Sequence, residues 1–186
     1  MSETTLERRQ WTERLWSRWP SALGIALAAF ILTGDGALDS ATELIPLLAL
    51  EYLLVAKLGR REATWPVIAG LSVVIAVVMA LDMVPLPTVV AAIAVIVLAW
   101  SAVDGQLFRS GEFQLQAVGM VGFGALTLVG LAVDPDAARH VVAAAWLLHG
   151  AWDFVHLWRD EVVRRSYAES CGVADVLVAF GLVLLV

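Results

Sequence analysis

The stretch VVAAAWLLHGAWDFVHLW, residues 141–158, is apolar along most of its length but carries two histidines and an aspartate. His149, Asp153 and His156 are four and three residues apart, a spacing that places all three side chains on one face of an α-helix. The flanking residues are typical of a membrane-spanning helix, in which an ionisable side chain costs at least about 2.5 kcal/mol near the centre. The stretch therefore predicts a functional site inside a membrane.

The whole chain has the composition of an integral membrane protein. Of its 186 residues, 60% are hydrophobic, and the mean hydropathy is +0.82, well above that of an ordinary soluble domain. The net charge of −6 indicates little about partners, because most Lys and Arg residues lie in short segments between apolar runs. No segment has the pattern of a nucleic-acid-binding module, and the single cysteine, Cys171, excludes an intrachain disulfide.

Seven apolar runs follow an amphipathic N-terminal segment. Residues 1–20 mix tryptophan and leucine with arginine, which is typical of a helix lying in the membrane interface. The later runs are close to the roughly 20 residues needed to cross a bilayer, so we expect residues 21–186 to form a single transmembrane α-helical bundle. The first and last runs are short, which leaves five or six spans as alternatives. The seven predicted spans are near residues 21–35, 41–57, 64–83, 87–103, 114–133, 137–158 and 169–186.

The distribution of basic residues predicts the orientation of this bundle. Short inner loops of membrane proteins are enriched in Lys and Arg. With seven spans and a cytoplasmic N-terminus, only Arg139 of the 12 basic residues lies outside. The inner ones are Arg8, Arg9, Arg14, Arg18, Lys57, Arg60, Arg61, Arg109, Arg159, Arg164 and Arg165.

Acids from two other predicted spans fall at about the depth of Asp153. A rise of about 1.5 Å per helical residue places Glu51, in the second span, and Asp175, in the seventh, near that level. Unpaired carboxylates that share a low-dielectric pocket repel one another, so we expect at least one of the three to hold a proton at neutral pH.

One catalytic interpretation is acid–base chemistry on a lipid or isoprenoid-like substrate that enters from the bilayer. Asp153, Asp175 or Glu51 would be the acid or base, and His149 and His156 would be its partners. Aromatic side chains near the same depth would line the substrate pocket and stabilise a carbocation with their π faces. These candidates for the pocket are Tyr52, Trp100, Trp146, Trp152 and Phe154.

A metal site is the other catalytic interpretation. His149, Asp153 and His156 supply the nitrogen and oxygen ligands that a divalent metal such as zinc accepts, as in a metal-dependent hydrolase. Carboxylates would have to complete the coordination sphere, because the sequence has no HExxH motif and no third histidine at this depth. The cofactor prediction therefore stays open between none and a divalent metal.

Transport and a purely structural role are the non-catalytic alternatives. Histidines and acids inside a membrane are also typical of proton- or cation-coupled carriers, and Glu43, Asp82 and His140 would extend such a path through the outer half. A carrier this small would work as a homodimer, and the glycines of the span near residues 114–133 favour close helix packing or a dimer face. In a structural protein, the polar side chains would only bridge helices.

The C-terminal third resembles a pattern in small, uncharacterised prokaryotic multi-span membrane proteins. There His-x-x-x-Asp-x-x-His is followed by Tyr, Cys and Asp, here Tyr167, Cys171 and Asp175. This resemblance covers residues 149–175 and implies a prokaryotic plasma membrane but no known activity. The basic residues and the seven spans predict that the N-terminus lies inside and the C-terminus outside.

In span number and acid placement the chain is also similar to the seven-span integral-membrane terpene cyclases. Their proposed acids lie on the second and seventh helices, as Glu51 and Asp175 do here. This chain is shorter, and its histidine-bearing sixth span has no counterpart in those enzymes. The resemblance adds to the residue patterns, so an intramembrane enzyme acting on a lipid or isoprenoid is the leading hypothesis and a small transporter is the second.

Overall fold

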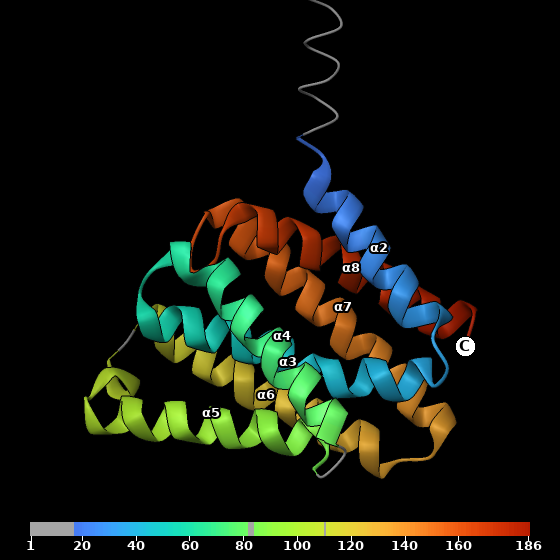
Figure 1. The fold of residues 1–186 in the computed structure, drawn as a ribbon, viewed down its shortest axis with the longest axis horizontal. Helices are drawn as coiled ribbons and strands as arrows, with labels where there is room; N and C mark the ends of the chain where they lie inside the picture. The colour runs from blue at the N-terminus through green and yellow to red at the C-terminus, as the bar shows by residue number, and fades with distance from the viewer. Residues whose placement is uncertain (1–16, 82–83, 110) are drawn as a thin grey trace, which may run out of the picture.

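The computed structural model describes residues 17–81, 84–109 and 111–186. Within these ranges the fold is all-helical, as the sequence predicts, with seven α-helices and two short 3-10 turns (Figure 1). The interfacial helix predicted over residues 1–20 falls almost entirely outside the described residues, and Asp82 does as well.

Each α-helix overlaps one of the apolar runs in the sequence. Two helices begin four residues before their runs: one starts at Ala37 and the other at Arg165. Hydropathy misses both first turns because they contain polar residues, although Tyr167 is buried in the bundle. The helices are α2 (Trp19–Thr33), α3 (Ala37–Leu58), α4 (Thr64–Leu81), α5 (Leu86–Val103), α6 (Glu112–Ala132), α7 (Pro135–Arg159) and α8 (Arg165–Leu184), and the 3-10 turns are η1 (Arg61–Ala63) and η2 (Gln106–Phe108).

Four segments of the described chain are long and apolar enough to cross a membrane. A fifth helix, α2, is apolar but shorter. The two remaining helices, α3 and α7, have sufficient length but carry charged residues that lower their hydropathy, and α7 also carries three histidines. The four segments are Arg61–Leu81, Leu86–Val103, Glu112–Ala132 and Arg165–Leu184.

Helix α3 occupies the centre of the bundle. It contacts α2, α4, α5, α6, α7 and α8, and its residues Leu50, Leu53 and Val55 are fully buried. Helices α7, α8 and α2 pack side by side through the most extensive contacts in the molecule, as Figure 1 shows. Helix α4 lies at an edge against α3 and α5 and is largely exposed. The interior therefore surrounds α3, and α6, α7 and α8 supply most of the buried residues that pack around it.

Two glycines allow these helices to approach closely. A Cβ atom at Gly24 of α2 would lie 2.3 Å from the Ser170 carbonyl oxygen of α8, and one at Gly150 of α7 would lie 3.1 Å from the Asp175 Cβ. Small residues at such positions are typical of tightly packed membrane helices. Because Gly150 follows His149 directly, the close approach of α7 and α8 also brings Asp175 to that histidine.

Candidate functional site

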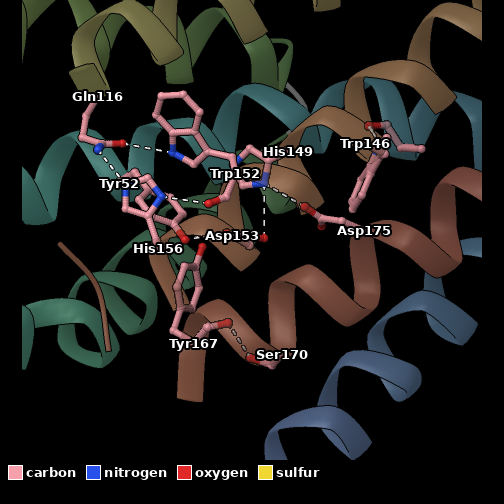
Figure 2. Close-up of polar contacts among 11 residues, drawn as sticks. Tyr52, Gln116, Trp146, His149, Trp152, Asp153, His156, Tyr167, Ser170 and Asp175 are labelled. Carbon is pink, nitrogen blue, oxygen red and sulfur yellow. Dashed lines mark hydrogen bonds and ion pairs between the residues drawn. The ribbon is translucent and has the colours of Figure 1, made fainter. Parts of the chain in front are cut away.

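A cluster of four buried polar side chains joins α3, α7 and α8 (Figure 2). The His149 Nδ1 atom lies 2.7 Å from Asp175 Oδ2 and 3.5 Å from Asp153 Oδ2. The Tyr52 hydroxyl donates a hydrogen bond of 2.5 Å to the other oxygen, Oδ1, of Asp153. All four residues are at most 1% exposed. The structure thus brings together Tyr52, His149, Asp153 and Asp175, and we call these four residues the His–Asp cluster.

The local helix geometry explains how the cluster forms. His149 and Asp153 are one turn apart on α7, so their side chains meet on one face. Asp175 follows Tyr167 and Cys171 at intervals of four residues on α8, which places all three on one stripe. Because this stripe faces α7 and α3, the Asp175 carboxylate lies beside the His149 imidazole.

The cluster holds more negative than positive charge when its acids are ionised. With both carboxylates ionised, one protonated imidazole leaves a net charge of −1, which is costly in a buried site unless a further proton or cation is present. In addition, His149 Nε2, Asp153 Oδ2 and Asp175 Oδ1 are buried without a hydrogen-bond partner. The site is therefore suited to taking up a proton or a cation.

A divalent metal is one candidate for that cation. Nitrogen and oxygen atoms of His149, Asp153 and Asp175 lie within 4.8 Å of one another, which is close enough for one ion. However, the 2.7 Å separation between His149 Nδ1 and Asp175 Oδ2 is that of a direct hydrogen bond. In this conformation the three residues form a hydrogen-bonded group, and a metal would have to displace the shared proton.

His156 belongs to a second network, on the side of α7 that faces α6. Its Nε2 atom lies 3.0 Å from Gln116 Nε2, and its Nδ1 atom lies 2.8 Å from the Trp152 carbonyl oxygen. The Trp152 indole donates to Gln116 Oε1 at 3.2 Å. Since the amide nitrogen of Gln116 can only donate, His156 Nε2 accepts and Nδ1 carries the proton. This pattern fixes a neutral imidazole, so His156 does not join His149 and Asp153 around one ion.

Gln116 is a site residue that the sequence interpretation missed. It is 1% exposed and supplies both hydrogen bonds that link α6 to α7 in this network. The available signal was an amide inside an otherwise apolar predicted span.

Glu51 faces a different space from the His–Asp cluster. Both of its carboxylate oxygens are buried without a hydrogen-bond partner. The side chain lies on the wall of a cavity of about 260 Å³ between α2, α3, α4, α7 and α8, which we call the apolar cavity. The other lining residues are mostly aliphatic: Leu27, Ile31, Leu44, Leu47, Leu48, Ile68, Leu71, Ser72, Ile75, Trp146, Tyr167 and Cys171.

Tyr167 and Cys171 separate the apolar cavity from the His–Asp cluster. Both line the cavity, and both interact electrostatically with Glu51 and Asp153. The Tyr167 ring also lies 5.9 Å from that of Tyr52, centroid to centroid. Tyr167 and Cys171 are therefore close both to Glu51 and to the buried carboxylates.

The predicted pocket aromatics are distributed over several places. Trp146 lines the apolar cavity, and its indole donates to the Ala41 carbonyl oxygen at 3.0 Å. Phe154 is 41% exposed and packs over Gly172. Tyr52 belongs to the His–Asp cluster and Trp152 to the network of His156. Only Trp146 of the five therefore lines the cavity beside Glu51.

Trp100 lies away from these sites, at the end of α5. Its side chain is 57% exposed, and the Lys57 ammonium lies 4.3 Å from its ring centroid. Lys57 also forms an ion pair with Asp104, just beyond α5. The hydrogen bond from Lys57 holds the pKa of Asp104 below its usual range. Trp100 thus contributes to a cation–π contact that joins α3 to α5.

The polar residues predicted for the outer half do not reach the apolar cavity. Neither Glu43 nor His140 lines it. His140 is exposed, and its Nδ1 atom lies 2.7 Å from the Asp136 carbonyl oxygen. These positions agree with solvation at an interface, and Asp82 lies outside the described residues.

No protein-family model, curated protein or solved structure matches this chain.

Proposed function

We propose that the protein is an intramembrane enzyme that performs acid–base chemistry on a lipid or isoprenoid-like substrate, with Glu51 as the acid. The observation that carries this proposal is the carboxyl group of Glu51, which is buried without a partner on the wall of an otherwise apolar cavity. A cavity of this lining suits an apolar chain. The acid is therefore placed where such a chain would bind.

The apolar surroundings favour the neutral form of Glu51. An ionised carboxylate without a partner is costly in an apolar medium, so the group holds its proton instead. A carboxylic acid kept neutral in this way can deliver the proton to a substrate.

The simplest reaction that fits is double-bond isomerisation or cyclisation. The Glu51 proton adds to one carbon of a C=C bond, the π electrons form the new C–H bond, and a carbocation remains on the neighbouring carbon. The Glu51 carboxylate then removes a proton from an adjacent carbon, which restores both the acid and a double bond. The faces of Trp146 and Tyr167, which line the cavity, would stabilise the cation.

In this proposal, the His–Asp cluster holds a proton behind the cavity wall. His149 lies between the carboxylates of Asp153 and Asp175, and Tyr167 and Cys171 connect this region to Glu51. Because the Glu51 oxygens have no hydrogen-bond partner, a water molecule or a side-chain movement would have to link Glu51 to this region before it could recover a proton that the substrate does not return.

The proposal includes seven membrane spans with the N-terminus in the cytoplasm of a prokaryotic cell. Seven described α-helices and the excess of Lys and Arg at one side support this arrangement. It places the start of α4, the end of α7 and the start of α8 at the inner surface.

The cavity favours an enzyme over a carrier. A carrier needs polar groups that lead to both membrane faces, whereas the lining of this cavity is aliphatic apart from Glu51 and a few other groups. Glu43 and His140 do not line it.

Deuterium incorporation tests the proposed function. The purified protein in liposomes is incubated in D2O with prenyl alcohols, prenyl phosphates and unsaturated phospholipids. We expect deuterium bound to carbon in a prenyl lipid, because the acid exchanges with solvent before it protonates the chain. No deuterium in any lipid, together with protein-dependent proton flux across the liposomes, would instead identify a carrier.

A pair of variants on α4 provides the control for this test. Ile75→Trp should lower the incorporation rate at least about tenfold, because its indole would fill the apolar cavity and displace the chain from the acid. Val73→Trp adds the same group at a position that is 63% exposed and outside the cavity, so its rate should match that of the wild type. Equal rates in both variants would place the reaction elsewhere.

A further inference from the structure

A second hollow, of about 390 Å³, lies between the starts of α4 and α8 and has a polar lining. Three arginines and one glutamate line it, so the lining has an excess of positive charge. Its lining residues are Arg61, Glu62, Arg164, Arg165 and Ser166, and we call it the arginine hollow.

The arginines retain donors that the described protein does not use. Arg61 donates to both carboxylate oxygens of Asp160, through Nη2 at 2.5 Å and Nη1 at 3.2 Å, yet its Nε atom is buried without an acceptor. Arg165 donates through Nη1 to the Leu157 carbonyl oxygen at 2.8 Å, which uses one of its five N–H groups. Among the described residues, the exposed guanidinium of Arg164 has no hydrogen-bond or ion-pair partner. Several charged donors are thus available to an anion.

The arginine hollow adjoins the apolar cavity. Ser166 lines the hollow and the next residue, Tyr167, lines the cavity. On the other side, Glu62 of the hollow and Ile68 of the cavity are separated by roughly 10 Å of helical rise. Trp65 lies between these elements, because its indole donates to the Ser166 hydroxyl at 3.2 Å and its ring meets that of Tyr167 edge-on. An elongated molecule that occupied both spaces would therefore pass beside Trp65 and Tyr167.

We infer that the substrate is an isoprenoid lipid with a phosphate or diphosphate headgroup, which binds in the arginine hollow while the chain enters the apolar cavity. This inference rests on the proposed function, because it assigns the chain to the cavity that contains Glu51. Arginine forks match the oxygens of phosphate, and a group with more than one negative charge engages several of them at once. A zwitterionic headgroup would instead place its own cation among the arginines.

The size of the cavity favours one chain over two. Its volume of about 260 Å³ is just below the roughly 300–1,000 Å³ of typical ligand pockets. A single prenyl chain fits such a space better than the paired acyl chains of a phospholipid.

Binding to the purified, detergent-solubilised protein tests this inference, with three probes measured by titration calorimetry. The probes are a prenyl phosphate, the prenyl alcohol of the same chain length, and inorganic phosphate. We expect the prenyl phosphate to bind at least about tenfold more tightly than the alcohol, since charged hydrogen bonds hold its headgroup. Equal affinity for the alcohol and the phosphate, or equally tight binding of inorganic phosphate alone, would overturn the inference.

Arginine variants locate the headgroup. The double variant Arg164→Gln with Arg165→Gln should weaken prenyl phosphate binding by about 10- to 100-fold and leave alcohol binding unchanged. Arg159→Gln removes a charge from the same inner segment, but Arg159 pairs with Glu161 and does not line the arginine hollow. If Arg159→Gln weakened binding as much as the double variant, general charge attraction would explain the affinity and the hollow would not be the site.

The Glu51→Gln variant separates this inference from the proposed function. It should stop deuterium incorporation but still bind the prenyl phosphate more tightly than the prenyl alcohol of the same length, because Glu51 does not line the arginine hollow. If the wild type bound the phosphate headgroup specifically but incorporated no deuterium, the proposed enzyme activity would be refuted and the headgroup site would be retained. If deuterium entered a prenyl alcohol as fast as a prenyl phosphate and the two lipids bound equally well, the proposed enzyme activity would stand and the headgroup site would be refuted.

Discussion

Replacing Glu51 with glutamine should lower the rate of carbon-bound deuterium incorporation by about 10²- to 10⁴-fold, the usual contribution of a positioned acid. Glutamine keeps the shape of the side chain, but its amide has no acidic proton to transfer. The variant should fold normally, because the Glu51 oxygens make no hydrogen bond that the change would break. Mass spectrometry of the recovered lipid, with a thermal unfolding curve of the protein, measures both effects.

Two further variants make this prediction specific. Glu43→Gln changes an acid on the same helix that does not line the cavity, so its rate should equal that of the wild type. Glu51→Asp keeps the acid but withdraws it by one methylene, so we expect an intermediate rate. A Glu51→Gln protein as active as the parent would exclude Glu51 as the acid.

Replacing Asp175 with alanine should lower the free energy of unfolding by about 3–5 kcal/mol, as when one partner of a buried ion pair is removed. The change removes the acceptor that lies 2.7 Å from His149 Nδ1 and leaves a void between α7 and α8. Asp175→Asn retains an oxygen acceptor of similar volume and should cost less. Denaturant unfolding in detergent measures the three proteins side by side.

An exposed aspartate provides the stability control. Asp136 also forms an ion pair, with Arg139 at 2.7 Å, but its side chain is 88% exposed. Surface pairs contribute at most about 1 kcal/mol, so Asp136→Ala should change the stability little. If Asp175→Ala were as stable as Asp136→Ala, the His–Asp cluster would not hold α7 to α8.

The sequence predicts the helical class well, because long apolar runs leave few alternatives. It also predicts that His149 and Asp153 share a face of one helix, since that depends only on their spacing. The spacing does not reveal the partners from other helices. His156 shares the face, yet its ring bonds to Gln116 while Asp175 takes the place beside His149.

The depth of a residue in the membrane is easier to infer from sequence than the direction in which its side chain points. Counting residues predicts that Glu51 and Asp153 lie at a similar depth in the membrane. It does not predict which side of α3 each neighbouring helix contacts. Glu51 and Tyr52 are consecutive and therefore point about 100° apart. Tyr52 meets Asp153, whereas Glu51 faces the apolar cavity. The rotation of α3 depends on packing against six other helices, which hydropathy does not describe.

For aromatic and small residues, too, the sequence does not predict which neighbours each residue contacts. Trp100 and Trp146 both lie in apolar runs, but the first stacks with Lys57 near the bundle surface and the second lines the cavity. Among the glycines of α6, Gly119 packs against Trp152, whereas Gly122 faces no described residue within 4 Å. Composition identifies such residues as candidates, and only the packing of the bundle distinguishes their roles.

The central claim is that Glu51 holds a proton inside a cavity that a prenyl chain occupies. Labelling with N,N′-dicyclohexylcarbodiimide, an apolar reagent that reacts with protonated carboxyl groups, followed by peptide mass spectrometry, tests it most directly. We expect an adduct on Glu51 and none on Glu43, and we expect a prenyl alcohol or prenyl phosphate to suppress it. An unlabelled Glu51, or an adduct that neither prenyl lipid reduces, would contradict the claim.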